Sequence, residues 1–141
     1  MHIAAELRAT SRYSRCVKAF RYAVKSIGSG LAQVDYAGHM PDTIKTHIAE
    51  TEALVHAEPV RFGLLYVVPE FTSFDRRQVV FHADMLKRLG DKVAAVAVLH
   101  ARPVVRFGAT TVGLLAKTPI ETFDDREQAL AWLESCRRRV P

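Results

Sequence analysis

Two short runs of almost uninterrupted apolar residues, at positions 62–68 and 93–99, dominate the hydrophobic pattern of the chain. Runs of this length without polar alternation are typical of strands covered on both faces of a parallel sheet. Residues 31–37, between the turn signal of Gly28-Ser29-Gly30 and Gly38, form a third predicted strand. Residues 119–123 form a short fourth strand that begins with a proline. The pattern therefore predicts a sheet whose central strands are buried.

Between these strands, apolar residues recur at helical spacing and predict four helices. The first opens at Pro41, because proline suits the first helical turn. The second has residues 72–75 as its N-cap and reciprocal acid, and it ends before Gly90. The third follows Pro103, and the fourth begins at a capping segment, residues 122–127. The alternation of strand and helix indicates an α/β domain. The expected apolar faces comprise Ile44, Ile48, Leu54, Val55, Val79, Ala83, Leu86, Leu89, Val104, Phe107, Thr111, Leu114, Ala129, Trp132, Leu133 and Cys136.

The composition suits one soluble domain: 141 residues, of which 49% are hydrophobic and 25% charged. No apolar run approaches the roughly 18 residues that a membrane-spanning helix needs. The two cysteines, Cys16 and Cys136, form no CxxC pair, which favours a reduced, cytoplasmic compartment. Six basic residues and one acidic residue lie in residues 1–27, whereas the remaining 14 basic and 14 acidic residues balance over the body. A neutral body argues against nucleic-acid binding.

The basic N-terminal segment has two interpretations. As a helix, it places Tyr13, Cys16, Val17, Phe20, Val24 and Ile27 opposite its cations, and residues 1–27 then form a weak membrane-surface contact. The same scarcity of acids is found in organelle transit peptides. As a strand, Phe20, Tyr22 and Val24 alternate with polar neighbours and pair with residues 31–37 across the Gly-Ser-Gly turn. Periodicity alone slightly favours the helix.

Four segments, taken in their order along the chain, resemble those of a known protein family. Residues 34–41 lead from a strand into a helix, residues 61–68 and 94–99 are buried strands, and residues 123–133 are a cap followed by an amphipathic helix. From about Phe20 onward, this series resembles the SpoIIAA-like branch of the STAS/SEC14 superfamily. The resemblance implies a mixed sheet of four to five strands with an N-terminal antiparallel hairpin strand and about four helices. It favours the strand interpretation, with a single domain over residues 18–141 and a basic extension over residues 1–17.

Polar residues follow three of the predicted strand ends. They are His39 after the first strand, Glu70, Thr72 and Ser73 after the second, and His100 and Arg102 after the third. In open α/β sheets, ligands gather beyond the carboxyl ends of strands. We expect these groups to orient a small anion or a lipid headgroup, although ordinary polar loop ends are the simpler interpretation.

STAS regulators carry a phosphorylatable serine in an Asp-Ser-x-Gly turn. Here residues 69–75 place Thr72 and Ser73 in that neighbourhood, but the motif is absent. A phosphate at a helix N-terminus is physically reasonable. Helix capping explains both hydroxyls more simply.

No metal-ligand spacing, HExxH motif, phosphate-binding glycine loop or GxSxG elbow occurs in the sequence. We therefore expect no enzyme activity, no cofactor and no metal site. The resemblance implies a regulatory module that binds a protein partner. The alternative is a carrier or sensor of a small apolar or amphiphilic, lipid-like ligand. A homodimer formed through exposed helices or an edge strand is also expected.

Overall fold

The structure is a computed structural model that describes residues 19–69, 72–100 and 102–139. Five strands form one sheet: β1 (Arg21–Gly28), β2 (Leu31–Ala37), β3 (Phe62–Val67), β4 (Val93–Leu99) and β5 (Ile120–Phe123). Four α-helices pack on it: α2 (Ile44–His56), α3 (Arg76–Leu89), α4 (Pro103–Ala116) and α5 (Arg126–Arg138). A short 3₁₀ turn, η1 (Gly90–Lys92), connects α3 to β4. The predicted mixed sheet and its four helices are confirmed.

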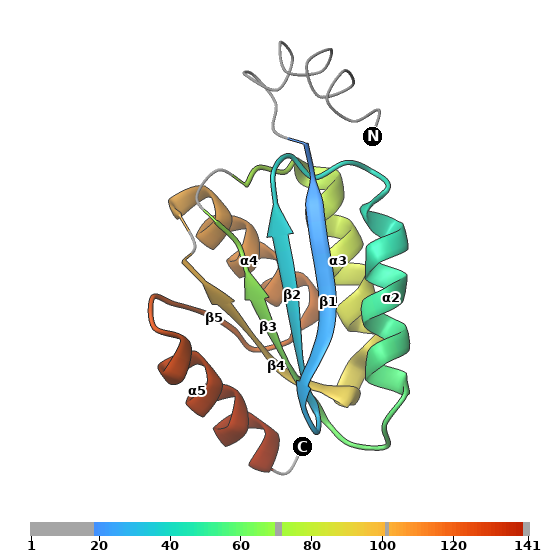
Figure 1. The fold of residues 1–141 in the computed structure, drawn as a ribbon, viewed down its shortest axis with the longest axis vertical. Helices are drawn as coiled ribbons and strands as arrows, with labels where there is room; N and C mark the ends of the chain where they lie inside the picture. The colour runs from blue at the N-terminus through green and yellow to red at the C-terminus, as the bar shows by residue number, and fades with distance from the viewer. Residues whose placement is uncertain (1–18, 70–71, 101, 140–141) are drawn as a thin grey trace, which may run out of the picture.

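The strands lie in the sheet in the order in which they occur in the chain, β1-β2-β3-β4-β5. The β1–β2 pair is antiparallel and every later pair is parallel. Right-handed crossovers that always step in the same direction bring their helices to the same face of a sheet. Accordingly, α2, α3 and α4 cover one face, whereas α5 lies on the other (Figure 1).

The alternation of strand side chains divides the core between these two faces. Val34, Leu64 and Val96 belong to the cluster under α2, α3 and α4. Leu65 and Ala97, one position further along their strands, pack with Leu133 under α5. All seven residues of β4 are buried, as the continuous apolar run predicts.

The N-terminal hairpin settles part of the helix-or-strand question. Residues 21–28 are strand β1, in which Tyr22 and Val24 pack against the core while Arg21 and Lys25 are exposed. The interpretation of residues 21–27 as a basic membrane helix is therefore wrong, because pairing with β2 uses this segment as a strand. Residues 1–17, the predicted extension, lie outside the described residues. No helix in the described ranges is long and apolar enough to cross a bilayer.

Two local predictions need correction. The first helix begins at Ile44 and not at Pro41, because residues 41–43 form a turn before it. The N-cap of α3 is Asp75, which accepts a hydrogen bond from the Arg77 N–H, while Gln78 bonds back to the Asp75 N–H. This capping box leaves the hydroxyls of Thr72 and Ser73 free for other partners.

The apolar positions predicted for α4 lie on its outer side. Val105, Gly108 and Val112 are its buried residues, whereas Val104, Phe107 and Leu114 are exposed. The prediction followed the large apolar residues, but only small ones fit inward here. A Cβ on Gly108 would collide with the ring of Phe74, so α4 packs close to its neighbours.

Candidate functional site

The carboxyl ends of β2, β3 and β4 meet at one edge of the sheet, because these strands are parallel neighbours. The segment after β2 and the loop before α3 are joined there by backbone hydrogen bonds. The Ser73 N–H donates to the Gly38 carbonyl at 3.2 Å, and the Met40 N–H donates to the Ser73 carbonyl at 2.9 Å. Within this bridge, His39 Nδ1 lies 2.8 Å from Ser73 Oγ. We call His39 and Ser73 the histidine–serine pair.

Thr72 and Arg102 also hold this loop through hydrogen bonds. The Thr72 side chain is fully buried and donates to the Tyr36 carbonyl at 3.3 Å. Arg102 Nη2 donates to the Thr72 carbonyl at 3.4 Å. Of the two residues Thr72 and Ser73, only Ser73 is partly exposed.

The remaining predicted site residues do not join this arrangement through side-chain hydrogen bonds in the described structure. His100 is exposed, has a left-handed φ of 60°, and donates its backbone N–H to the Phe123 carbonyl at 2.9 Å. It thus ties the end of β4 to β5. Glu70 lies outside the described residues.

In the histidine–serine pair a hydroxyl lies within hydrogen-bonding distance of an imidazole. With its proton on Nε2, His39 accepts at Nδ1 from the Ser73 hydroxyl and makes that oxygen a better acceptor for a transferred group. No carboxylate in the described residues holds the opposite ring nitrogen, so the pair lacks the third group of a hydrolase triad. No cluster of three metal-binding side chains occurs in the same ranges.

The sequence placed His39 and Ser73 at the ends of neighbouring strands, but it did not predict the hydrogen bond between them, because they are 34 residues apart. The available signal was positional: both follow the ends of adjacent parallel strands, and a shared edge brings such residues together.

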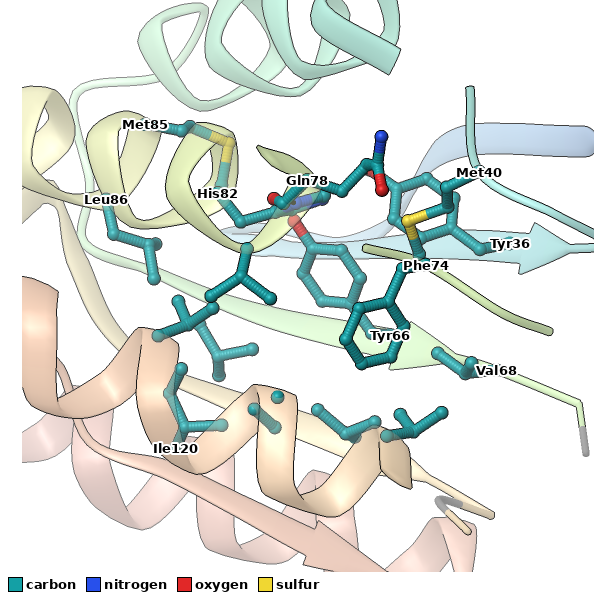
Figure 2. A pocket seen from close by; sticks show the side chains of 17 residues that line it. Tyr36, Met40, Tyr66, Val68, Phe74, Gln78, His82, Met85, Leu86 and Ile120 are labelled. Carbon is teal, nitrogen blue, oxygen red and sulfur yellow. Dashed lines mark hydrogen bonds between the residues drawn. The ribbon is translucent and has the colours of Figure 1, made fainter. Parts of the chain in front are cut away.

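A cavity of about 90 Å³ lies between the sheet, α3 and α4 (Figure 2). Its lining is almost entirely apolar and includes Met40, Val68, Phe74, Leu86 and Ile120. Pockets for drug-sized ligands usually enclose about 300 Å³ or more. A lipid-like molecule therefore does not fit this cavity in the described conformation.

A small polar network projects into this apolar cavity (Figure 2). His82 Nδ1 lies 2.6 Å from the Gln78 carbonyl, which can only accept, so Nδ1 carries the proton. His82 Nε2 then accepts from the Tyr36 hydroxyl at 3.0 Å, and the ring is neutral. The Tyr66 hydroxyl beside it is buried and makes no hydrogen bond to a described residue. Burial raises the pKa of both phenols, so they stay protonated.

Acidification should destabilise the protein through His82. Burial lowers the pKa of this imidazole below the ordinary 6.5, and its bond to the Gln78 carbonyl only partly compensates. At a pH between the lowered pKa of folded His82 and the ordinary pKa of the unfolded chain, the unfolded state binds a proton that the folded state does not. His82 therefore contributes stability above about pH 6.5 that is lost as the pH falls. Urea unfolding midpoints at about pH 7.5 and about pH 5.5 would measure this loss.

Two variants identify the source of this pH dependence. His82→Gln should reduce the difference between the two midpoints, whereas His56→Gln, at an exposed position, should leave it unchanged. The pKa of His47 is also lowered by burial, so part of the dependence should remain. An undiminished difference in His82→Gln would contradict the prediction.

A family model described as SpoIIAA-like matches residues 31–134 of the sequence. The chain belongs to the SpoIIAA-like family. The match covers β2 to most of α5 and therefore includes the histidine–serine pair and the cavity. No curated protein matches the sequence.

Three solved structures share the fold of this SpoIIAA-like chain and cover 82% of it. An anti-sigma factor antagonist from Mycobacterium paratuberculosis has a TM-score of 0.60 at 17% identity, with 95% of its own chain covered. The anti-sigma factor antagonist SpoIIAA in its unphosphorylated form has a TM-score of 0.57 at 14% identity and 97% coverage. An uncharacterised DUF3478 protein from Shewanella loihica has a TM-score of 0.56 at 11% identity and 94% coverage. At these identities the likeness shows the fold alone.

Proposed function

We propose that this SpoIIAA-like protein is a non-catalytic regulatory module that binds a protein partner through the sheet edge where α3 begins. The histidine–serine pair is the observation that carries this proposal. It fixes a single accessible hydroxyl beside the start of a helix, on a domain of the fold that anti-sigma factor antagonists share. The cavity gives no comparable support to a lipid carrier, because of its size.

We propose further that Ser73, and not Thr72, is the position at which phosphorylation controls binding. Thr72 is fully buried, whereas Ser73 is only partly buried. A phosphate adds about −1.5 to −2 charges at neutral pH. At Ser73 it would replace the hydroxyl that lies 2.8 Å from His39 Nδ1. A phosphate there changes the charge at the start of α3, which is the surface that we propose for the partner.

The decisive experiment identifies the partner and then compares variants. The tagged full chain is cross-linked in its source cells, the retained protein is purified, and its affinity is measured by titration calorimetry. Ser73→Asp should weaken binding by about tenfold or more, because a negative charge introduced into the interface disrupts a contact with the partner. Ser73→Ala should bind nearly as well as the wild type.

Ser26→Asp serves as the matched control, because Ser26 is exposed on β1 and pairs with Ala32, at the opposite end of β2 from His39. It adds the same charge and should leave affinity unchanged. Equal binding by Ser73→Asp and the wild type would end the switch proposal. Substrate turnover that required both His39 and Ser73 would end the non-catalytic one.

A further inference from the structure

The outer face of α4 carries four large apolar side chains. Phe107 and Leu114 are 75% and 76% exposed, and Val104 and Leu115 are about half exposed. Val80 of the neighbouring helix α3 is 46% exposed. We call these five residues the α4 surface. A helix on the outside of a soluble domain normally turns polar residues outward, so a row of large apolar side chains there is typical of a binding face.

The two threonines within this row, Thr110 and Thr111, use their hydroxyls inside the helix. Thr110 Oγ1 and Thr111 Oγ1 each donate at 3.0 Å to the carbonyl four residues earlier, on Arg106 and Phe107. Their hydroxyls are thus used inside the helix. The row between Phe107 and Leu114 consequently offers a partner little hydrogen-bonding capacity.

The charges around the α4 surface are positive. The sequence contains no acidic residue between Asp91 and Glu121, but it places Arg102, Arg106 and Lys117 in and beside α4. On α3, Arg76 and Lys87 lie four residues before and seven after Val80, on the same side of the helix. Asp84, four residues after Val80, is the one acidic residue of α3 on this side, and the charge of Arg88 offsets it.

This charge distribution selects among possible occupants. A second copy packed through α4 would bring cations together, and like charges across an interface cost affinity. The N-terminal extension is also basic, with Arg8, Arg12 and Arg15 against Glu6. An acidic occupant is complementary. On α4 the exposed apolar residues Val104, Phe107 and Leu114 are separated by three and seven positions, and this narrow row suits an apposed helix better than a bilayer.

We infer that the α4 surface binds an acidic amphipathic helix of a protein partner. Phe107 and Leu114 contact its apolar stripe, and Lys87 and Lys117 face its carboxylates. The inference rests on the proposed function, since it gives the chemistry of the partner, but it concerns a different surface from the histidine–serine pair.

The test uses the folded full chain and two fluorescently labelled designed helices. Both carry leucine on one stripe, and glutamate fills the remaining positions of one and lysine those of the other. Anisotropy should show the glutamate helix binding at least about tenfold more tightly, with the ratio shrinking as added salt screens the charges. Amide chemical shifts should change at the α4 surface.

Two double variants separate the apolar and the charged contributions. Phe107→Ser with Leu114→Ser should abolish binding of the glutamate helix. Lys87→Glu with Lys117→Glu should reverse the preference between the two helices. Arg21→Glu with Lys25→Glu makes the same change of net charge on the exposed side of β1 and should leave the preference intact.

Four outcomes would overturn the inference: no binding of either helix, equal or tighter binding of the lysine helix, shift changes away from α4, or flotation on phosphatidylcholine–phosphatidylserine vesicles that requires Phe107 and Leu114. The last result would make α4 a membrane surface. If the natural partner binds the Phe107→Ser, Leu114→Ser variant normally yet still responds to Ser73→Asp, the inference fails while the proposed function stands. If instead Ser73→Asp leaves binding of the natural partner unchanged while the Phe107→Ser, Leu114→Ser variant loses it, the proposed switch at Ser73 fails and the inference stands.

Discussion

Replacing Leu133 by alanine should lower the free energy of unfolding by about 3 kcal/mol, within the range of buried leucine truncations. Leu133 is fully buried in α5 and packs against the sheet beside Gly63. A Cβ added at Gly63 would lie 3.1 Å from the Cβ of Leu133. In the described structure α5 alone covers this face, so neighbouring helices cannot close the cavity that the truncation leaves. Urea denaturation followed by circular dichroism measures the change.

Leu114→Ala is the matched control, because it removes the same atoms from a side chain that is 76% exposed. Its unfolding free energy should stay within about 0.5 kcal/mol of the wild type. Similar losses in the two variants would show that Leu133 is not the buried anchor of α5, or that Leu114 is covered in solution. Dilution would distinguish these cases, since only an intermolecular cover weakens with falling protein concentration.

Gly30→Ala should destabilise the protein by about 3 kcal/mol, from two causes that add. Gly30 has φ +71°, and a left-handed backbone costs other residues roughly 1–2 kcal/mol. An added Cβ would also collide with the guanidinium of Arg137 and lie 2.9 Å from the Arg61 carbonyl oxygen. Such overpacking costs roughly 1–3 kcal/mol. The substitution thus strains the hairpin turn and displaces the end of α5 together.

A double-mutant cycle with Arg137→Ala tests the steric half of this prediction. Alone, Arg137→Ala removes the 2.9 Å hydrogen bond from Nε to the Arg61 carbonyl and should cost about 1 kcal/mol. Combined with Gly30→Ala, it also removes the group that the new Cβ meets. The double variant should therefore lose about 1 kcal/mol less than the sum of the two single losses. Strict additivity would contradict the predicted collision.

The sheet was predictable because the strands that form its centre are apolar on both sides. Residues 62–68 and 93–99 have no polar position that a solvent-facing strand requires, so their burial follows from composition and length. The final helix was equally readable, since Asp125 accepts hydrogen bonds from the N–H groups of Glu127 and Gln128. In each case the signal lies within a few residues of the chain.

The features that failed depend on partners distant in the sequence. Asp75 caps α3, while the hydroxyls of Thr72 and Ser73 bond to Tyr36 and His39 from another strand end. The inward side of α4 consists of small residues because Phe74 lies close to it. The cavity has walls from the sheet and two helices, so no local pattern indicates it. Of the predicted site residues, the structure joins His39 and Ser73 directly, and Arg102 through the backbone of Thr72.

The placement of α5 bears on how the chain is made in the cell. Proteins are synthesised from the N-terminus, and domains acquire structure as they leave the ribosome. The strands and the helices α2, α3 and α4 precede α5, so the nascent sheet can be complete while Leu65, Ala95, Ala97 and Leu99 still face water. Those four side chains are the surface that a chaperone would recognise. The risk of aggregation is therefore concentrated in the short interval before residues 126–138 emerge and dock.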